Sequence, residues 1–133
     1  MVGTTLEQSK HLLELGLDPY TASLCFNTGP GLDELMIRPY AKETILRKIL
    51  SVPLVRYKPS WTFDDLWKIM RLTEQDHKNT GFDMITTLRG SLLRFKEKED
   101  IGNDIKTIHW EEEITPLESA YKMVCWLLEN KYI

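Results

Sequence analysis

Apolar residues near the end of the chain repeat at helical spacing and predict a buried helix. They recur every three or four positions, at Leu117, Ala120, Tyr121, Val124, Leu127 and Leu128. Thr115 and Glu118 are spaced as a capping box, in which each side chain reaches a backbone N–H that lacks a helical partner. Because Trp126 widens the apolar side, we expect residues 116–129 to pack broadly against a core.

Two short helices joined by a tight corner are predicted at the N-terminus. The first covers residues 5–15, and Gly16 stands where a left-handed residue commonly ends a helix. Asp18 and Pro19 then favour a second start, as capping residue and first helical residue. This second helix is expected to turn four residues inward: Ala22, Leu24, Cys25 and Phe26.

The segment 32–58 gives mixed signals. Four apolar residues have helical spacing there, at Ile45, Leu46, Ile49 and Leu50. Prolines at positions 39, 53 and 59 confine any helix to about residues 40–50, because proline lacks the backbone donor that a helix interior needs. Residues 54–57 would also suit a short extended piece. We favour a helix over 40–50.

Thr62 marks the start of a central helix, which we expect over residues 63–71. Its hydroxyl can cap the helix, and Asp64 and Asp65 add negative charge to the first turn, where the helix dipole favours it. The polar residues 73–81 that follow predict a loop.

A three-stranded antiparallel meander is predicted between this loop and the terminal helix. Its strands are expected over residues 82–89, 92–98 and 104–112, where β-branched and aromatic residues are frequent. Gly90 and Ser91 suit a two-residue type II′ turn. Alternation along the strands predicts one wet face and one covered face, the covered face carrying Leu93, Phe95, Ile108 and Trp110.

Together these elements predict an α+β fold: short N-terminal helices, a central helix, a three-stranded meander and a C-terminal helix packed on the sheet. The length of 133 residues and the hydrophobic content of 42% fit a single domain, 1–133. No apolar run approaches the ~20 residues of a membrane span, and no secretion signal is visible. We therefore expect a cytoplasmic protein with reduced Cys25 and Cys125; a secreted form with one bridge between them is the less favoured alternative.

A basic segment in an otherwise acidic chain is the feature that most indicates binding. The net charge is −3, yet residues 38–58 set six basic residues against one acid, Glu43. An anionic partner would contact these six: Arg38, Lys42, Arg47, Lys48, Arg56 and Lys58. Nearby aromatic residues would suit single-stranded nucleic acid, whereas a solvated amphipathic helix explains the segment equally well.

Side chains typical of catalysis occur, but their spacing predicts no active site. The acidic run 111–113 alternates in direction on a strand, so its carboxylates do not converge on one metal ion. Cys25 and Cys125 have apolar neighbours, and apolar burial raises a thiol's pKa and leaves it unreactive. The histidines come from three separate elements, at His11, His77 and His109. We expect a non-enzymatic protein with no cofactor, no metal site and no small-molecule substrate.

Three stretches resemble a group of small uncharacterised bacterial proteins. They are Leu12-Leu13-Glu14-Leu15-Gly16-Leu17 with Thr21-Ala22, Pro59-Ser60-Trp61 with Leu66, and Met123-Val124-Cys125-Trp126-Leu127-Leu128-Glu129-Asn130-Lys131-Tyr132-Ile133. Many members of this group are carried on prophages or other mobile elements of gut-type anaerobes. The group has no assigned activity, so the resemblance implies an accessory context and transfers no functional residue.

These observations favour an accessory or interaction protein. A three-stranded sheet has two edges, and an edge can take a strand from a protein partner or from a second copy. The alternatives are a nucleic-acid-associated factor that uses the basic segment 38–58 and an enzyme of unrecognised type.

Overall fold

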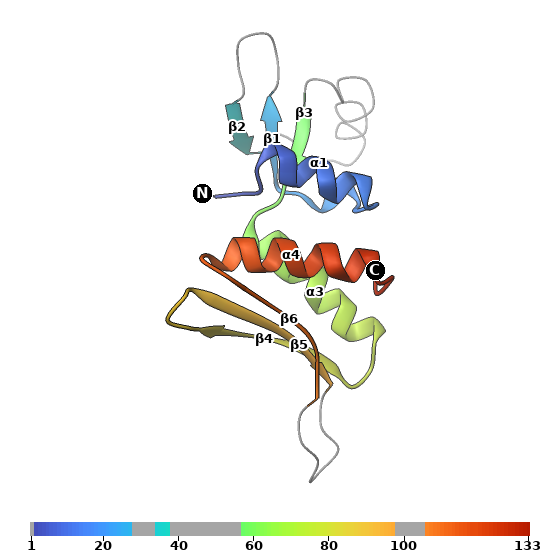
Figure 1. Ribbon diagram of the computed structural model, residues 1–133. Helices are drawn as coiled ribbons and strands as arrows, with labels where there is room; N and C mark the ends of the chain where they lie inside the picture. The colour runs from blue at the N-terminus through green and yellow to red at the C-terminus, as the bar shows by residue number, and fades with distance from the viewer. Residues whose placement is uncertain (1, 28–33, 38–56, 98–105) are drawn as a thin grey trace. The chain divides into compact units, whose positions relative to one another are not determined.

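The computed structural model describes residues 2–27, 34–37, 57–97 and 106–133 (Figure 1). The described residues form helices and two antiparallel sheets, so the predicted α+β class is confirmed. The chain divides into two compact units, Met1–Asp65 and Leu66–Ile133, and each is described by itself. The single domain expected over 1–133 stays a prediction.

The first helix of the first unit, α1, covers Leu6–Glu14, as predicted. Thr5 caps it: its hydroxyl accepts from the N–H of Gln8, whose side chain accepts from the N–H of Thr5. Gly16 ends it with a φ of 99°, a left-handed conformation that costs glycine little. The N–H of Leu17 then returns to the carbonyl of Leu12, 3.0 Å away, and completes the predicted cap.

The predicted second helix is wrong beyond a single turn. Asp18 caps a short 3₁₀ helix, η1, over Pro19–Thr21, and the backbone is extended at Ala22. The strand β1 follows at Leu24–Asn27, where helix was expected. The reason lies at Ser23, whose N–H bonds to the distant carboxylate of Asp65. That donor is therefore taken out of any local helix.

A second correction is the sheet that β1 forms, which the sequence did not predict. Its strand order is β2-β1-β3, with β2 at Glu34–Ile37 and β3 at Tyr57–Ser60, both antiparallel to β1. Tyr57, from the end of the extended piece considered above, is the first residue of β3. The helix expected over 40–50 lies outside the described residues.

Buried hydroxyls join the N-terminal segment to the end of β3. The Thr4 Oγ1 atom lies 2.7 Å from Ser9 Oγ and accepts from the N–H of Trp61 at 3.1 Å. Ser60 donates its hydroxyl to the Thr4 carbonyl at 2.8 Å. Thr4 and Ser60 have no exposed surface, so these bonds satisfy groups that would otherwise be costly to bury.

The central helix, α3, starts where predicted but is longer. It covers Phe63–Asp76, and Thr62 and Asp65 cap its start reciprocally. Residues 73–76, expected in a loop, continue the helix, and the hydroxyl of Thr73 bonds back to the carbonyl of Ile69. The chain leaves the helix through Asn79, which has a φ of 65°.

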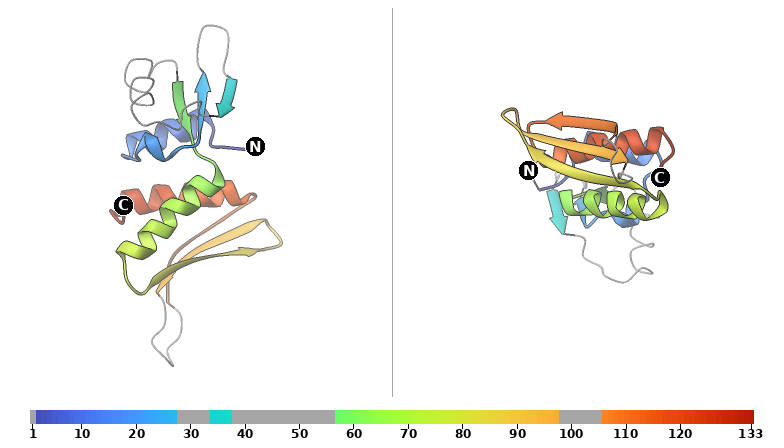
Figure 2. Two further views of the ribbon diagram at one scale, coloured as in Figure 1. Left: turned by 180° about the vertical axis from the view of Figure 1, so that it is seen from behind. Right: turned by 90° about the horizontal axis from the view of Figure 1, so that it is seen from below.

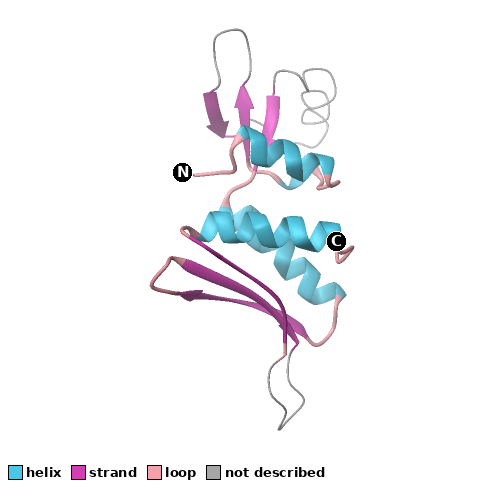
Figure 3. Ribbon diagram, viewed as in Figure 1, coloured by secondary structure: helices cyan, strands magenta, loops and turns pink. Residues whose placement is uncertain are grey.

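The predicted meander is confirmed in the second unit, with β4 at Thr80–Thr86, β5 at Ser91–Glu97 and β6 at Thr107–Glu113 (Figure 3). The turn between β4 and β5 differs from the predicted one. Thr87 and Gly90 bond to each other across Leu88 and Arg89, which form the tip. Gly90 is needed because a Cβ there would lie 2.3 Å from the carbonyl oxygen of Glu113.

The C-terminal helix, α4, covers Pro116–Glu129 and packs on β5 and β6, as predicted. Thr115 caps it by accepting from the N–H of Glu118. The hydroxyl of Ser119 donates to the carbonyl of Ser91, 2.7 Å away, and ties the helix to the central strand. The helix and strand core is closed to solvent, with no exposed surface at Leu93, Phe95, Met123, Val124 and Leu127.

Candidate protein-binding surface

Among the described residues of Leu66–Ile133, no helix or strand covers one face of the β4-β5-β6 sheet. Helices α3 and α4 both lie on the opposite side (Figures 1 and 2). We call this open side the outer face. Alternation in the strand register assigns to it Gly81, Asp83 and Ile85 of β4, Leu92, Arg94 and Lys96 of β5, and Trp110 and Glu112 of β6.

Trp110 lies on the outer face, so its predicted place on the covered face is wrong. It stands opposite Arg94 and is 58% exposed. The covered position belongs to His109, which stands opposite Phe95 and stacks on Trp126 with ring centroids 4.2 Å apart. The pairing of β5 with β6 shifts by one residue between Phe95 and Lys96. An extra residue in one strand moves the side chains beyond it to the opposite face of the sheet, so simple alternation along β6 does not hold.

Apolar side chains gather at the hairpin end of the outer face. Ile85, 45% exposed, stands opposite Leu92, and Trp110 lies on the next strand along. Leu88, at the tip of the β4–β5 hairpin, is fully exposed. Ile114, just beyond β6, is also largely exposed. Single exposed apolar residues are ordinary, but a set that includes a tryptophan is typical of binding surfaces.

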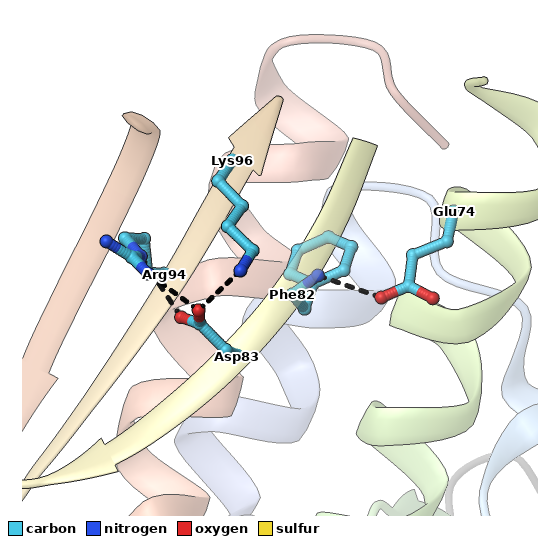
Figure 4. Close-up of polar contacts among 5 residues, drawn as sticks. All are labelled: Glu74, Phe82, Asp83, Arg94 and Lys96. Atoms are coloured by element: carbon cyan, nitrogen blue, oxygen red, sulfur yellow. Dashed lines mark hydrogen bonds and ion pairs between the residues drawn. The ribbon is translucent and has the colours of Figure 1, made fainter. Parts of the chain in front are cut away.

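The centre of the outer face is a compact ionic group (Figure 4). Arg94 makes two hydrogen bonds to Asp83, at 3.1 Å to Oδ1 and 2.7 Å to Oδ2. The Nζ atom of Lys96 lies 2.8 Å from the same Oδ2 atom. The hydrogen bond from Arg94 lowers the pKa of Asp83, and the same bond raises the pKa of Arg94. Asp83 is therefore ionised near neutral pH, and the group has one net positive charge.

The two edges of the sheet differ in how they are protected. On the β4 edge, Glu74 of α3 accepts a hydrogen bond from the N–H of Phe82 at 2.8 Å (Figure 4). This side-chain oxygen takes the place that the carbonyl of a neighbouring strand would occupy. The rest of the β4 edge, at Met84–Thr86, carries no ionisable side chain, and Asp83 just before it is paired with Arg94.

The β6 edge is protected by charge. Glu111, Glu112 and Glu113 follow one another along it, and Lys122 of α4 pairs with Glu113. The carboxylates alternate between the two faces of the sheet, as expected, and do not converge. Acidic residues and a bulge are two of the devices that keep an edge strand from pairing with another chain.

Most of the predicted anionic-partner site lies outside the described residues. Arg38, Lys42, Arg47, Lys48 and Arg56 belong to that undescribed segment. Lys58 is described: it is exposed on β3, opposite Phe26 of β1. Whether these six side chains share one surface stays a prediction.

Histidine and cysteine side chains occupy structural positions in the described chain. Among these residues, no three His, Cys, Asp or Glu side chains gather as metal ligands would. Both cysteines are buried, and desolvation raises the pKa of the Cys125 thiol to about 11. The Nε2 atom of His77 lies 3.0 Å from the carbonyl oxygen of Tyr132, a contact that holds the chain end.

Comparison with known proteins yields no relative: no family model, curated protein or solved structure matches the chain. The resemblance to small uncharacterised bacterial proteins therefore stays a prediction. Within the described ranges, every helix is too short or too polar to cross a membrane.

Proposed function

We propose that this chain is a non-enzymatic accessory protein that binds another polypeptide through the outer face of its β4-β5-β6 sheet. The observation that carries this proposal is the exposure of Trp110 beside Arg94, on a face that no described helix or strand of its own unit covers. Tryptophan and arginine are the residues that most often dominate the binding energy of protein interfaces.

The chemistry of the outer face favours a polypeptide partner. Trp110 and Ile85 offer apolar surface, which gains about 25 cal/mol per Å² when it is removed from water. The carboxylate of Asp83 already balances one of the two neighbouring cations. A partner that covers this group therefore has one net positive charge to balance rather than two, and leaving that charge buried and unpaired would be expensive.

The proposal also includes the cellular context in which the protein acts. The resemblance to proteins of prophages and other mobile elements supports an accessory role in the bacterial cytoplasm.

Site-specific photo-crosslinking in the native host tests the proposal. A photoreactive phenylalanine analogue placed at position 110 should give covalent adducts with another polypeptide, either a different protein or a second copy. The matched control places the same analogue at position 72, where Leu72 is 56% exposed on α3, away from the outer face. Adducts from position 72 alone, or from neither position, would contradict the proposal.

A further inference from the structure

We propose that the partner at the β4 edge is a second copy of this chain, paired antiparallel about a two-fold axis at Ile85. This proposal rests on the proposed function, because it uses the same sheet as the binding surface. It specifies one partner, a second copy, and one strand register. The dimer can therefore be disproved without disproving binding of another protein through the outer face.

The hydrogen-bonding pattern of β4 shows which backbone groups face outward. Thr87 and Gly90 bond to each other on the β5 side. In an antiparallel ladder, bonded and non-bonded pairs alternate, so Ile85 and Asp83 also bond toward β5. The N–H and C=O groups of Met84 and Thr86 then point to the open edge, as does Phe82, whose N–H is held by Glu74.

One register satisfies these outward groups in both copies. When Ile85 stands opposite Ile85 of the second copy, Met84 stands opposite Thr86, and Thr86 opposite Met84. Both of those pairs bring outward-facing backbone groups together, so the ladder continues across the axis. The next outward group is the N–H of Phe82, where Glu74 already bonds, so the pairing ends there.

The central contact in this register is apolar. Ile85 forms a non-bonded pair with its equivalent, and side chains in such pairs are close, with Cβ atoms about 5 Å apart. Ile85 is 45% exposed in the single chain, so each copy has apolar surface to cover. β-branched residues are well suited to this cross-strand contact.

Charge complementarity favours the same register. Asp83, already paired with Arg94 and Lys96, falls opposite the neutral Thr87 of the second copy. The exposed Arg89 at the hairpin tip falls opposite Gly81, beside the Glu74 carboxylate, which bonds to Phe82 through Oε1 and pairs with Arg71 through Oε2 at 3.3 Å. Because of the two-fold symmetry, this contact between Arg89 of one copy and Glu74 of the other occurs twice in the dimer.

The β6 edge is a poorer site for a second copy. Pairing β6 with itself would place the acidic residues of two chains, Glu111, Glu112 and Glu113 of each, along one seam. Like charges across a strand pair are destabilising. The self-complementary edge is therefore β4.

Sedimentation equilibrium of the full chain tests the proposal. The concentration should extend to about 1 mM, so that a weak dimer with a Kd in that range is also detected. The wild-type chain should dimerise. Ile85→Lys should be monomeric over the same range, because two like charges would face each other across the axis. Leu72→Lys, at an exposed apolar position of α3 away from the outer face, is the matched control and should dimerise as the wild type does.

A mixing experiment shows whether Ile85 faces its own equivalent. Ile85→Lys and Ile85→Glu should each be monomeric, and their equimolar mixture should form a heterodimer. Ile85→Cys should give a disulfide-linked dimer on oxidation, because Cα atoms in a non-bonded pair are about 4.5 Å apart, within the range that a disulfide spans. The native Cys25 and Cys125 are buried and should not compete.

Three outcomes would overturn the proposal: a wild-type chain that stays monomeric, a dimer that Ile85→Lys leaves intact, or a mixture of the two charged variants that stays monomeric. A dimer lost in Leu72→Lys but kept in Ile85→Lys would assign the contact to α3 instead. Failure here with crosslinks to a different protein from position 110 would leave the proposed function standing.

Discussion

Asp65 Oδ2 accepts hydrogen bonds from both the N–H and the hydroxyl of Ser23, at 2.8 and 2.7 Å, although the two residues are 42 positions apart. The same oxygen accepts from the N–H of Thr62 at 2.9 Å, where α3 begins. Asp65 is only 7% exposed. One carboxylate therefore joins the start of β1 to the cap of α3, and the first unit depends on it.

Asp65→Ala should lower the free energy of unfolding by about 3 kcal/mol, because it leaves several buried donors unpaired. Urea denaturation followed by tryptophan fluorescence measures the change. Asp64→Ala is the matched control: Asp64 lies in the same helical turn but is exposed, so its loss should cost about 0.5 kcal/mol. Equal effects from the two substitutions would mean that Asp65 does not hold the unit together.

The N-terminal segment lies so close to Ser60 and Leu24 at Gly3 that position 3 has no room for a side chain. A Cβ at position 3 would lie 2.6 Å from Ser60 Oγ and 3.0 Å from Leu24 Cδ1. Gly3→Ala should therefore lower the melting temperature, because the buried hydroxyl of Ser60 is held by the Thr4 carbonyl and cannot move aside.

A double-mutant cycle tests whether this contact is the cause. Ser60→Ala removes the crowding oxygen and also a buried hydrogen bond, so it should destabilise the chain by itself. The double variant Gly3→Ala/Ser60→Ala should be more stable than the sum of the two single effects predicts. If the two effects are additive, the destabilisation by Gly3→Ala does not come from its contact with Ser60.

Elements with a strong local signal could be predicted from the sequence. The helix α4 begins at Pro116 behind the Thr115 cap, and α1 ends at Gly16, as their capping residues indicate. Caps and helical spacing act within a few residues, so they can be recognised without knowing what the helix packs against. The meander has a similar local signal in the alternation along β5, whereas the details of its first turn and the facing of Trp110 were predicted wrongly.

Elements that depend on distant partners could not be predicted. The run from Leu24 to Asn27 is too short to distinguish a strand from a helix, and Asp65, which takes the preceding donor, is far along the chain. For the same reason, the exposure of Trp110 could not be predicted from the local sequence. Its facing follows from the register of β6 on β5, and the stacking of His109 on Trp126 accompanies that register.

The basic segment gives a third prediction, for the alternative in which the chain binds nucleic acid. If Arg47 and Lys48 contact phosphates, single-stranded DNA should bind with an affinity that falls steeply with salt. Reversing both charges should flatten the dependence of log K on log salt by roughly 1.4, about 0.7 for each lost contact. Fluorescence anisotropy with a labelled oligonucleotide measures both effects. Binding that is insensitive to salt and to the reversal would exclude this alternative.

The last prediction concerns the pH dependence that Asp83 contributes. Because Arg94 holds the folded pKa of Asp83 below its ordinary value of 3.8, the folded state keeps this carboxylate ionised more strongly than the unfolded chain does. Its contribution to stability is therefore present above the unfolded pKa and is lost as the pH falls through the folded pKa. Asp83→Asn should be less stable than the wild type at pH 7, and the difference should shrink as the pH falls below about 4. Urea denaturation across this pH range measures the difference. A constant gap between Asp83→Asn and the wild type would mean that ionisation of Asp83 does not stabilise the outer face.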